Sequence, residues 1–394
     1  MDYYARALQL QEETIAHRRW FHRNAEVGLS MPKGQAYALT ELKKLGIRAE
    51  PCGNGVSAVL GSPGRCILLR ADMDALPMAE ESGLDFACPT GTAAHCCGHD
   101  LHAAMLLTAA RLLKENEAAL EGTVKLMFQP GEETLEGARQ MLSAGILSDP
   151  APQAALAYHV TAGPTPPGTF MYSSDGPMMF SADGFRITLH GKGGHGAYPH
   201  TAIDPIHIGC HVYLALQGLI AREVDPAQAN VLTIGQFTAG NTANVIPHNA
   251  LLTGSIRSND PASRALLTRR LVEVTQKTAE ALGGSATVDM LYGIPPLYCH
   301  QALTEEMASY MGQLAIPGLT AIPGIRASAS EDFAAIAEKI PGVFMYLSAG
   351  FPDERGDAPA HNPKVLFNED VLPIGAAGYA HCATAWLRRA RSQP

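Results

Sequence analysis

Charged residues are scarce in this sequence, and long apolar runs are missing from it. Lysine, arginine, aspartate and glutamate make up 17% of the 394 residues, whereas apolar residues make up 46%. That balance is typical of a compact globular enzyme and argues against disorder. No run stays apolar for the roughly eighteen residues that a transmembrane helix needs. We therefore expect no membrane partner.

An excess of positive charge and an export signal are also missing. The net charge is -9 and the basic residues are scattered, so nucleic acid is not an expected partner. The first residues, 1–6, contain no basic segment followed by an apolar stretch, which predicts a cytoplasmic location. In that reducing compartment the eight cysteines are expected to be free thiols or metal ligands rather than disulfides.

The stretch from His95 to His102 is rich in metal-ligating side chains. It holds three histidines and two cysteines just before an apolar run with a helical period. Cys97 and His99 lie two positions apart, and in an extended turn both side chains can reach one point. The pattern predicts a loop of metal ligands followed by a helix that Asp100 caps. The alternative is a pair of ordinary buried thiols among surface histidines.

Three expected strands, 66–70, 124–128 and 154–158, end just before acidic or histidine side chains. These side chains are Asp72, Asp74, Glu132, Glu133 and His159. Strands alternate with helices here, which predicts an α/β fold with a mostly parallel sheet, and ligands bind at the carboxyl edge of such sheets. His361 lies in a loop rich in glycine and proline before the last helix, and it joins the candidates.

Two domains are expected, because 394 residues exceed what one hydrophobic core usually supports. Residues 183–294 show the order β-α-β-β-α-β, which predicts a ferredoxin-like α+β domain. The alternation of strands and helices seen in the first part resumes after it. The prediction is a discontinuous catalytic domain formed by residues 1–182 and 295–394, with residues 183–294 inserted.

The candidate donors suit a transition metal. They combine thiolate, imidazole and carboxylate groups from Cys97, His99, Glu133, His159 and His361. This mixture fits zinc or its neighbours and does not fit calcium or magnesium. A catalytic mononuclear zinc takes about three ligands from the protein, so five donors predict two metal ions and a hydrolytic reaction. Of the adjacent Glu132 and Glu133, one can bind metal while the other accepts a proton. The alternative is a solvated acidic pair at a helix N-terminus.

Seven short motifs extend in order over nearly the full length of the chain. They are RADMDALP at 70–77, HCCGHD at 95–100, QPGEE at 129–133, GKGGH at 191–195, ANVIP at 243–247, SEDF at 330–333 and HNP at 361–363. With them the chain resembles the co-catalytic dimetal aminoacylase and carboxypeptidase family, in its amidohydrolase branch. That branch contains hippurate hydrolase, N-acyl-amino-acid amidohydrolases and plant indole-acetyl-amino-acid hydrolases.

The resemblance implies specific roles in the first domain. It implies two divalent metal ions, with Cys97 as the bridging ligand. The implied ligands are Cys97, His99, Glu133, His159 and His361. Glu132 is implied as general base and then general acid, and Asp74 as the residue that orients a ligand. Zinc is the first expectation for the metal, and manganese, nickel and cobalt stay open.

For the inserted domain the resemblance implies a lid that carries the contact of a homodimer. His195 is expected to stabilise the tetrahedral oxyanion, reaching the site of the partner subunit. Asn244 and Arg257 are expected to grip the substrate carboxylate. The alternative for these three residues is structural, because a histidine in a glycine-rich turn can cap a helix and an arginine at a strand end is often a surface group.

The leading prediction is a metal-dependent amidohydrolase acting on a small-molecule substrate. It would cleave an N-acyl-L-amino acid, hippurate-like or N-acetylated, into a carboxylic acid and a free amino acid. Dipeptidase or carboxypeptidase activity with the same dimetal chemistry is the nearest alternative. The contrasting hypothesis is a non-catalytic module that binds a metal or a ligand. Loss of Glu132 or of a ligand would have supported that module, and all of them are present.

Overall fold

The computed structural model describes residues 1–389, and residues 390–394 of the expected catalytic domain lie outside the described part. The chain divides into two compact units. Unit 1 comprises Met1–Met178, Tyr298–Arg326 and the residues from Asp332 onward. Unit 2 comprises Met179–Leu297 and the short segment Ala327–Glu331.

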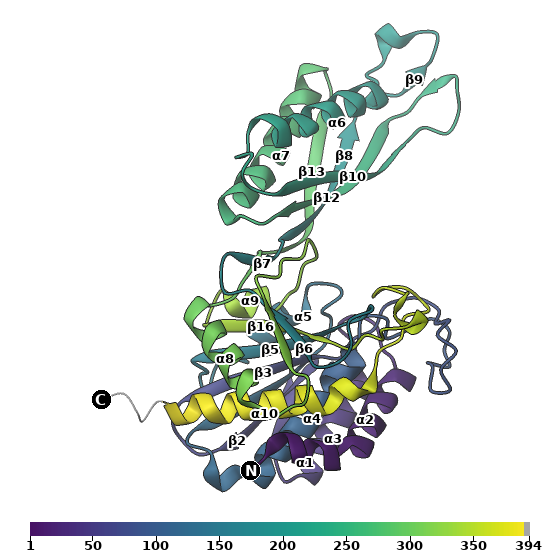
Figure 1. Ribbon diagram of the computed structural model, residues 1–394. Helices are drawn as coiled ribbons and strands as arrows, with labels where there is room; N and C mark the ends of the chain where they lie inside the picture. The colour runs from purple at the N-terminus through teal and green to yellow at the C-terminus, as the bar shows by residue number, and fades with distance from the viewer. Residues whose placement is uncertain (390–394) are drawn as a thin grey trace. The chain divides into compact units, whose positions relative to one another are not determined.

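Unit 1 is built on an eight-stranded sheet (Figure 1). The order across the sheet is β1 (Arg48–Cys52), β2 (Gly55–Gly61), β4 (Thr123–Gln129), β3 (Cys66–Asp72), β5 (Ala154–Thr161), β16 (Gly342–Ser348), β6 (Thr169–Tyr172) and β15 (Thr320–Pro323). The central strands β4, β3, β5 and β16 pair in parallel. Every residue of β3 and β4 is buried, as expected of parallel strands that are covered on both faces. Their carboxyl ends therefore meet at one edge of the sheet.

Helices cover this sheet (Figure 1). They are α1 (Tyr3–Gln9), α2 (Gln11–Arg23), α3 (Pro32–Lys44), α4 (His99–Glu115), α5 (Gly137–Ser143), α8 (Gln301–Gln313), α9 (Ala334–Ala337) and α10 (Leu372–Arg389), with 3-10 turns at Glu117–Ala119, Glu354–Gly356 and Glu369–Val371. α4 packs against β3, α2 and α10. All of its residues from His99 to Ala110 are buried, so the ligand-rich stretch leads straight into the interior of unit 1.

Unit 2 is a four-stranded antiparallel sheet with two helices. The sheet order is β10 (Asn230–Ala239), β12 (Asn249–Ser258), β8 (Ala182–His190) and β13 (Ser285–Ile294). Phe185, Leu252 and other buried side chains of the strands pack against α6 (Pro205–Arg222) and α7 (Pro261–Ala281). Chain order and sheet order together are ferredoxin-like. The predicted fold class, a mostly parallel α/β domain with an inserted α+β domain, is thus confirmed.

The remaining short elements belong to the loops. β9 (Gly194–His195) pairs with β11 (Val245–Ile246) next to a 3-10 turn at Pro199–Thr201. β7 (Pro177–Met179) and β14 (Leu297–Tyr298) lie where the chain passes from one unit to the other. Within residues 1–389, no helix combines the length and the apolar character that crossing a membrane requires.

Candidate metal centre

Gly98 fixes the turn between Cys97 and helix α4. Its φ of 91° is left-handed, and a Cβ at this position would lie 2.3 Å from Cγ2 of Val160. Only glycine fits such a turn. α4 begins directly afterwards, at His99, so Cys97 lies on the turn and His99 on the first helical residue.

Asp100 does not cap α4, contrary to the prediction. It lies inside the first turn, because the N-cap residue is Gly98. Its buried carboxylate instead accepts hydrogen bonds from Nε of Arg18 and Nδ1 of His22, each at 2.8 Å. Burial by itself would raise the pKa of Asp100, but the neighbouring Arg18 and His22 outweigh it and hold the pKa below its usual range. Asp100 therefore ties the start of α4 to α2.

His99 presents one ring nitrogen to the candidate centre. Its Nδ1 donates to the backbone carbonyl of Asp74 at 2.9 Å. Its buried Nε2 has no hydrogen-bond partner among the described residues, and carboxylate oxygens of Glu132 and Glu133 each lie 4.0 Å from it. A hydrogen bond from Nδ1 leaves Nε2 facing the candidate centre. Burial by itself would lower the pKa of His99, but the neighbouring Asp72 and Cys97 outweigh it and raise the pKa well above its usual value. A metal that binds Nε2 therefore displaces a proton.

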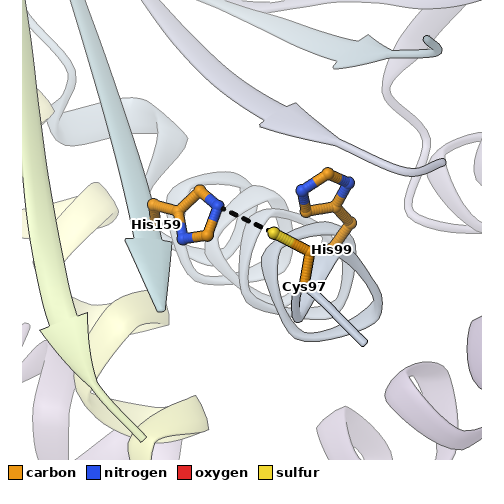
Figure 2. A group of neighbouring side chains, drawn as sticks. All are labelled: Cys97, His99 and His159. Atoms are coloured by element: carbon orange, nitrogen blue, oxygen red, sulfur yellow. Dashed lines mark hydrogen bonds between the residues drawn. The ribbon is translucent and has the colours of Figure 1, made fainter. Parts of the chain in front are cut away.

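His159 is held in the same way by strand β5 (Figure 2). β5 pairs with β16 as far as Thr161, so His159 lies inside the strand, whereas the sequence suggested that it follows the strand. Its Nδ1 donates to the carbonyl of Val160 at 2.7 Å, and its Nε2 lies 3.5 Å from Sγ of Cys97. Burial, together with the neighbouring His102, lowers the pKa of His159 well below its usual value. The ring is therefore neutral, as a metal ligand must be.

Cys97 belongs to two groups of potential ligands. One group contains Cys97, His99 and His159, and the other contains Cys97, Glu133 and His361. In the second group, Nε2 of His361 lies 3.3 Å from Sγ of Cys97 and 3.4 Å from Oε1 of Glu133. The structure therefore brings the five sequence-predicted ligands together around one sulfur, which is the placement that a bridging ligand needs.

The donor set of this cluster fits a pair of transition-metal ions. One thiolate, three imidazoles and one carboxylate are ligands that zinc and its neighbours prefer. Burial raises the pKa of the Cys97 thiol to about 12. Binding of this sulfur to a metal therefore releases a proton.

The loop of His361 is held in a strained conformation against the metal-ligand turn. His361 has a φ of 65°, which is uncommon outside glycine. Its backbone N–H donates to the carbonyl of Cys96 at 2.8 Å. Backbone strain of this kind persists where the surrounding structure enforces it, often at functional sites. The side chain of His361 is 54% exposed, so it forms the open side of the cluster.

Glu132 and Glu133 lie on a turn after β4 and not at a helix N-terminus. α5 begins only at Gly137, and Glu132 is 6% exposed, so the alternative of a solvated acidic pair on a helix is excluded. The N–H of Glu133 donates to Oδ2 of Asp74 at 3.0 Å. Because Asp74 also accepts from His99, this one residue positions two of the candidate ligands.

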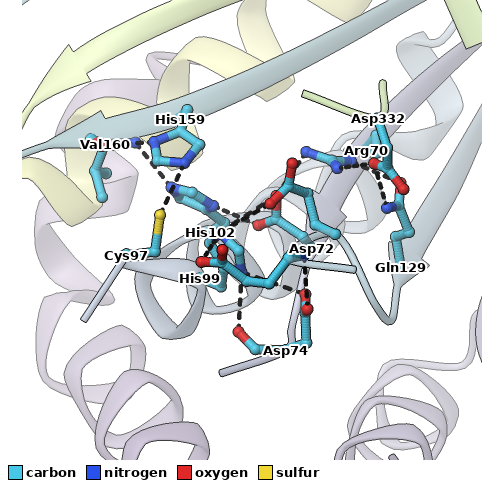
Figure 3. A network of polar contacts seen from close by, with 12 residues as sticks. Arg70, Asp72, Asp74, Cys97, His99, His102, Gln129, His159, Val160 and Asp332 are labelled. Atoms are coloured by element: carbon cyan, nitrogen blue, oxygen red, sulfur yellow. Dashed lines mark hydrogen bonds and ion pairs between the residues drawn. The ribbon is translucent and has the colours of Figure 1, made fainter. Parts of the chain in front are cut away.

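A buried polar network supports the centre (Figure 3). Asp72 accepts hydrogen bonds from Nη1 of Arg70, at 2.6 Å, and from Nδ1 of His102. Nε2 of His102 accepts in turn from the N–H of Val160 at 2.8 Å. Both ring nitrogens of His102 are thus used. His102 thereby orients the backbone next to His159.

Sequence reasoning missed most of this network. His102 lies three residues after His99 on α4, and that spacing places both on one helix face, which was the available signal. Arg70 also donates to Oδ1 of Asp332 at 3.0 Å, and Gln129 donates to the same oxygen at 2.7 Å. Asp332 is 262 positions from Arg70, so no local pattern could have revealed the contact.

Two of the predicted residues of unit 2, His195 and Asn244, lie together. His195, in β9, pairs with Val245 of β11, and the carbonyl of Asn244 accepts from the N–H of Gly196 at 2.8 Å. His195 and Asn244 are exposed. The ring of His195 accepts a hydrogen bond from the N–H of Ala197 at 3.1 Å, which fixes it within its own turn.

The third predicted residue of unit 2, Arg257, lies elsewhere. It is near the end of β12, where its Nη1 donates to Oγ of Ser330 at 2.6 Å. Asn244 precedes the other end of this ten-residue strand. A strand rises about 3.4 Å per residue, so roughly 25 Å separate Asn249 from Arg257. Asn244 thus lies in the loop before β12 and Arg257 near the end of that strand, and their predicted contact with a substrate carboxylate stays a prediction.

Comparison with known proteins gives matches over most of the chain. The family model described as peptidase family M20/M25/M40 matches residues 68–385. Thermostable carboxypeptidase 2 of Saccharolobus solfataricus is 32% identical over 380 residues, which are 94% of this chain and 95% of the relative. N-acetyl-L-cysteine deacetylase of Bacillus subtilis is 34% identical over 367 residues, 92% and 85% of the two chains. A solved dinuclear metal-binding peptidase of the M20 family from Bacillus subtilis is similar with a TM-score of 0.81 and 28% identity, over 96% of this chain and 99% of that one.

Proposed function

Because the chain belongs to peptidase family M20/M25/M40 and is therefore a metal-dependent hydrolase, we propose that it cleaves N-acyl-L-amino acids. The products are a carboxylic acid and a free amino acid. The observation that carries this proposal is the position of Cys97, shared by two groups of ligand atoms beside the buried carboxylate of Glu132.

The proposed centre holds two divalent ions, with Cys97 as the shared ligand. The proposed ligands are Cys97, His99, Glu133, His159 and His361. Zinc suits this mixture of sulfur, nitrogen and oxygen best, and manganese, nickel and cobalt are the alternatives. When bound, the two ions lower the pKa of a water molecule and polarise the oxygen of the scissile carbonyl.

Glu132 is proposed to move the proton of the reaction. Its carboxylate accepts a proton as the water oxygen adds to the amide carbon, and it returns that proton to the amide nitrogen as the C–N bond breaks. Oε2 of Glu132 lies 4.0 Å from Nε2 of His99, which supports a place at the centre. The burial of Glu132 limits exchange of this proton with bulk water.

Asp74 and the pair of Asp72 and His102 are proposed as positioning residues. Asp74 holds His99 through its carbonyl and Glu133 through its carboxylate. His102, anchored by Asp72, fixes the N–H of Val160 next to His159. These contacts define the ring orientations before a metal binds, which lowers the cost of assembling the site.

Unit 2 is proposed to be the lid and to carry the contact of a homodimer. The separation of Arg257 from His195 and Asn244 along the sheet supports this, because a substrate carboxylate and oxyanion held by all three need residues from two chains. We assign the oxyanion contact to His195 of the partner subunit and a carboxylate contact to the partner's Asn244. Arg257 then comes from the chain that holds the metal ions.

The nearest alternative is a carboxypeptidase or dipeptidase. The 32% identity with a thermostable carboxypeptidase favours it, whereas the 34% identity with a deacetylase of an N-acetylated amino acid favours the proposed reaction. Turnover of acyl-glycines, N-acetyl-amino acids and dipeptides, with zinc, manganese, nickel or cobalt added singly, separates the two. Release of amino acid from the acylated substrates supports the proposal, and turnover of dipeptides alone contradicts it.

A further inference from the structure

The exposed side of helix α6 in unit 2 carries three side chains of types that can bind metals. His207, Cys210 and His211 are all exposed. The ring centroids of His207 and His211 lie 4.7 Å apart. No hydrogen bond or ion pair joins these three side chains to the described part of the chain, so they are free to turn toward a common ligand.

The spacing of these residues suits chelation by one helix face. Residues three and four apart on an α-helix are neighbours, with Cβ atoms about 5–6 Å apart. His207 therefore neighbours both Cys210 and His211 one turn further on. Two histidines four apart on one helix face are the arrangement by which a helical His-Glu-x-x-His segment binds zinc.

The donor types select a borderline or soft metal. Two imidazoles and one thiolate suit zinc, and three protein ligands leave its fourth tetrahedral position to water. The Cys210 thiol gives its proton to solvent when the sulfur binds. Nothing in the proposed reaction uses these three residues.

We propose that His207, Cys210 and His211 form a surface zinc site, separate from the centre around Cys97. The proposal does not rest on the proposed hydrolysis, because all three residues lie on α6 of unit 2. Zinc binding at this site can be followed through the reactivity of the Cys210 thiol, since Cys210 is exposed and the seven other cysteines are buried.

The first test is the rate at which iodoacetamide alkylates Cys210, followed by peptide mass spectrometry with and without zinc. We expect saturating zinc to slow the alkylation at least about tenfold, because a metal-bound thiolate is a poor nucleophile. The double variant H207A/H211A should lose this protection, and Gln217→Ala on the same helix should keep it. Equal alkylation rates with and without zinc in the unmodified protein would overturn the proposal.

The second test is the zinc content after equilibration in buffered zinc. The unmodified protein should hold one zinc ion more per chain than H207A/H211A, and both should hydrolyse substrate at the same rate. Cys97→Ala should lose zinc from the other centre but keep the protection of Cys210, so failure of the proposed hydrolysis and failure of this site are distinguishable. Equal zinc content in the unmodified protein and H207A/H211A contradicts the surface site.

Discussion

Most candidate site residues of unit 1 are buried and hydrogen-bonded to neighbouring segments, with His361 largely exposed, whereas His195 and Asn244 of unit 2 lie on the surface. His99 and Asp74 are 0% and 1% exposed, and each is tied to a neighbouring segment by hydrogen bonds. His195 and Asn244 are exposed and contact mainly their own turns. The hydrogen bonds of unit 1 thus hold its candidate site residues in place between distant segments of one chain, whereas His195 is held by the N–H of Ala197 within its own turn.

The two sheets explain this difference. β3 and β4 are buried on both faces, so polar side chains at their carboxyl ends must find partners inside the protein. β10 is an edge strand of a sheet with one open face, and Val231 and Phe237 on it are 46% and 40% exposed. Because they are buried, the polar side chains around Asp72 require hydrogen-bond partners. The same burial strengthens those hydrogen bonds and keeps the network rigid.

The substitution Glu132→Ala should have the largest effect on the hydrolysis rate, and it should leave the folded structure of unit 1 intact. Loss of the general base should lower the hydrolysis rate by about 10²- to 10⁴-fold, while metal content and thermal unfolding stay unchanged. Glu136→Ala, an exposed glutamate after the same turn, is the matched control. Turnover of Glu132→Ala at the unmodified rate would show that another group moves the proton.

Arg18→Ala tests whether the buried ion pair of Arg18 with Asp100 stabilises unit 1. It removes a partner from the fully buried Asp100, and breaking such a pair costs about 3–5 kcal/mol. Urea unfolding should show this loss, whereas Arg269→Ala, which breaks an exposed pair with Glu273 in unit 2, should leave the free energy of unfolding nearly unchanged. Similar losses of unfolding free energy in both variants would show that the buried ion pair stabilises the protein no more than the exposed pair does.

His195→Ala tests the role of the exposed residues. Loss of one oxyanion donor should lower kcat by about 10²- to 10³-fold, with metal content unchanged. His200→Ala changes a nearby exposed histidine and should have no such effect. Mixing His195→Ala chains with Glu132→Ala chains should restore part of the activity, because one site of a mixed dimer then combines an intact Glu132 with the partner's His195. Absence of any recovery in mixed dimers argues for action within one chain.

The pH dependence of metal binding should show the smallest of these effects. Burial raises the pKa of Cys97 to about 12, so the thiol is protonated near neutral pH and loses that proton when it binds metal. Zinc affinity should therefore fall at least about tenfold for each pH unit of acidification, because His99, whose pKa is raised by Asp72 despite its burial, also loses a proton on binding. Competition with a chelator at about pH 6 and about pH 8, in the H207A/H211A background, measures this slope. An affinity that does not change with pH would mean that Cys97 is not a ligand.

Local patterns were sufficient to locate the candidate ligands that unit 1 brings together. The spacing of Cys97 and His99 and the position of Glu133 after a strand are short-range features, and strand ends of a parallel sheet converge whatever connects them. His361 was predicted as a candidate ligand because it is a histidine in a loop rich in glycine and proline. These inferences needed no knowledge of which helices pack together.

Long-range packing explains what the sequence did not show. Asp100 looked like a helix cap because its partners Arg18 and His22 lie on another helix, 82 and 78 positions away. His159 lies inside β5 because pairing with β16 extends that strand.

Anomalous X-ray diffraction from crystals loaded with zinc, measured at the absorption edge of the metal, tests most directly whether Cys97 bridges two metal ions. Two peaks are expected within about 2.5 Å of Sγ of Cys97, one among His99 and His159 and the other among Glu133 and His361. Crystals that contain zinc but show no anomalous peak at Cys97 would contradict it.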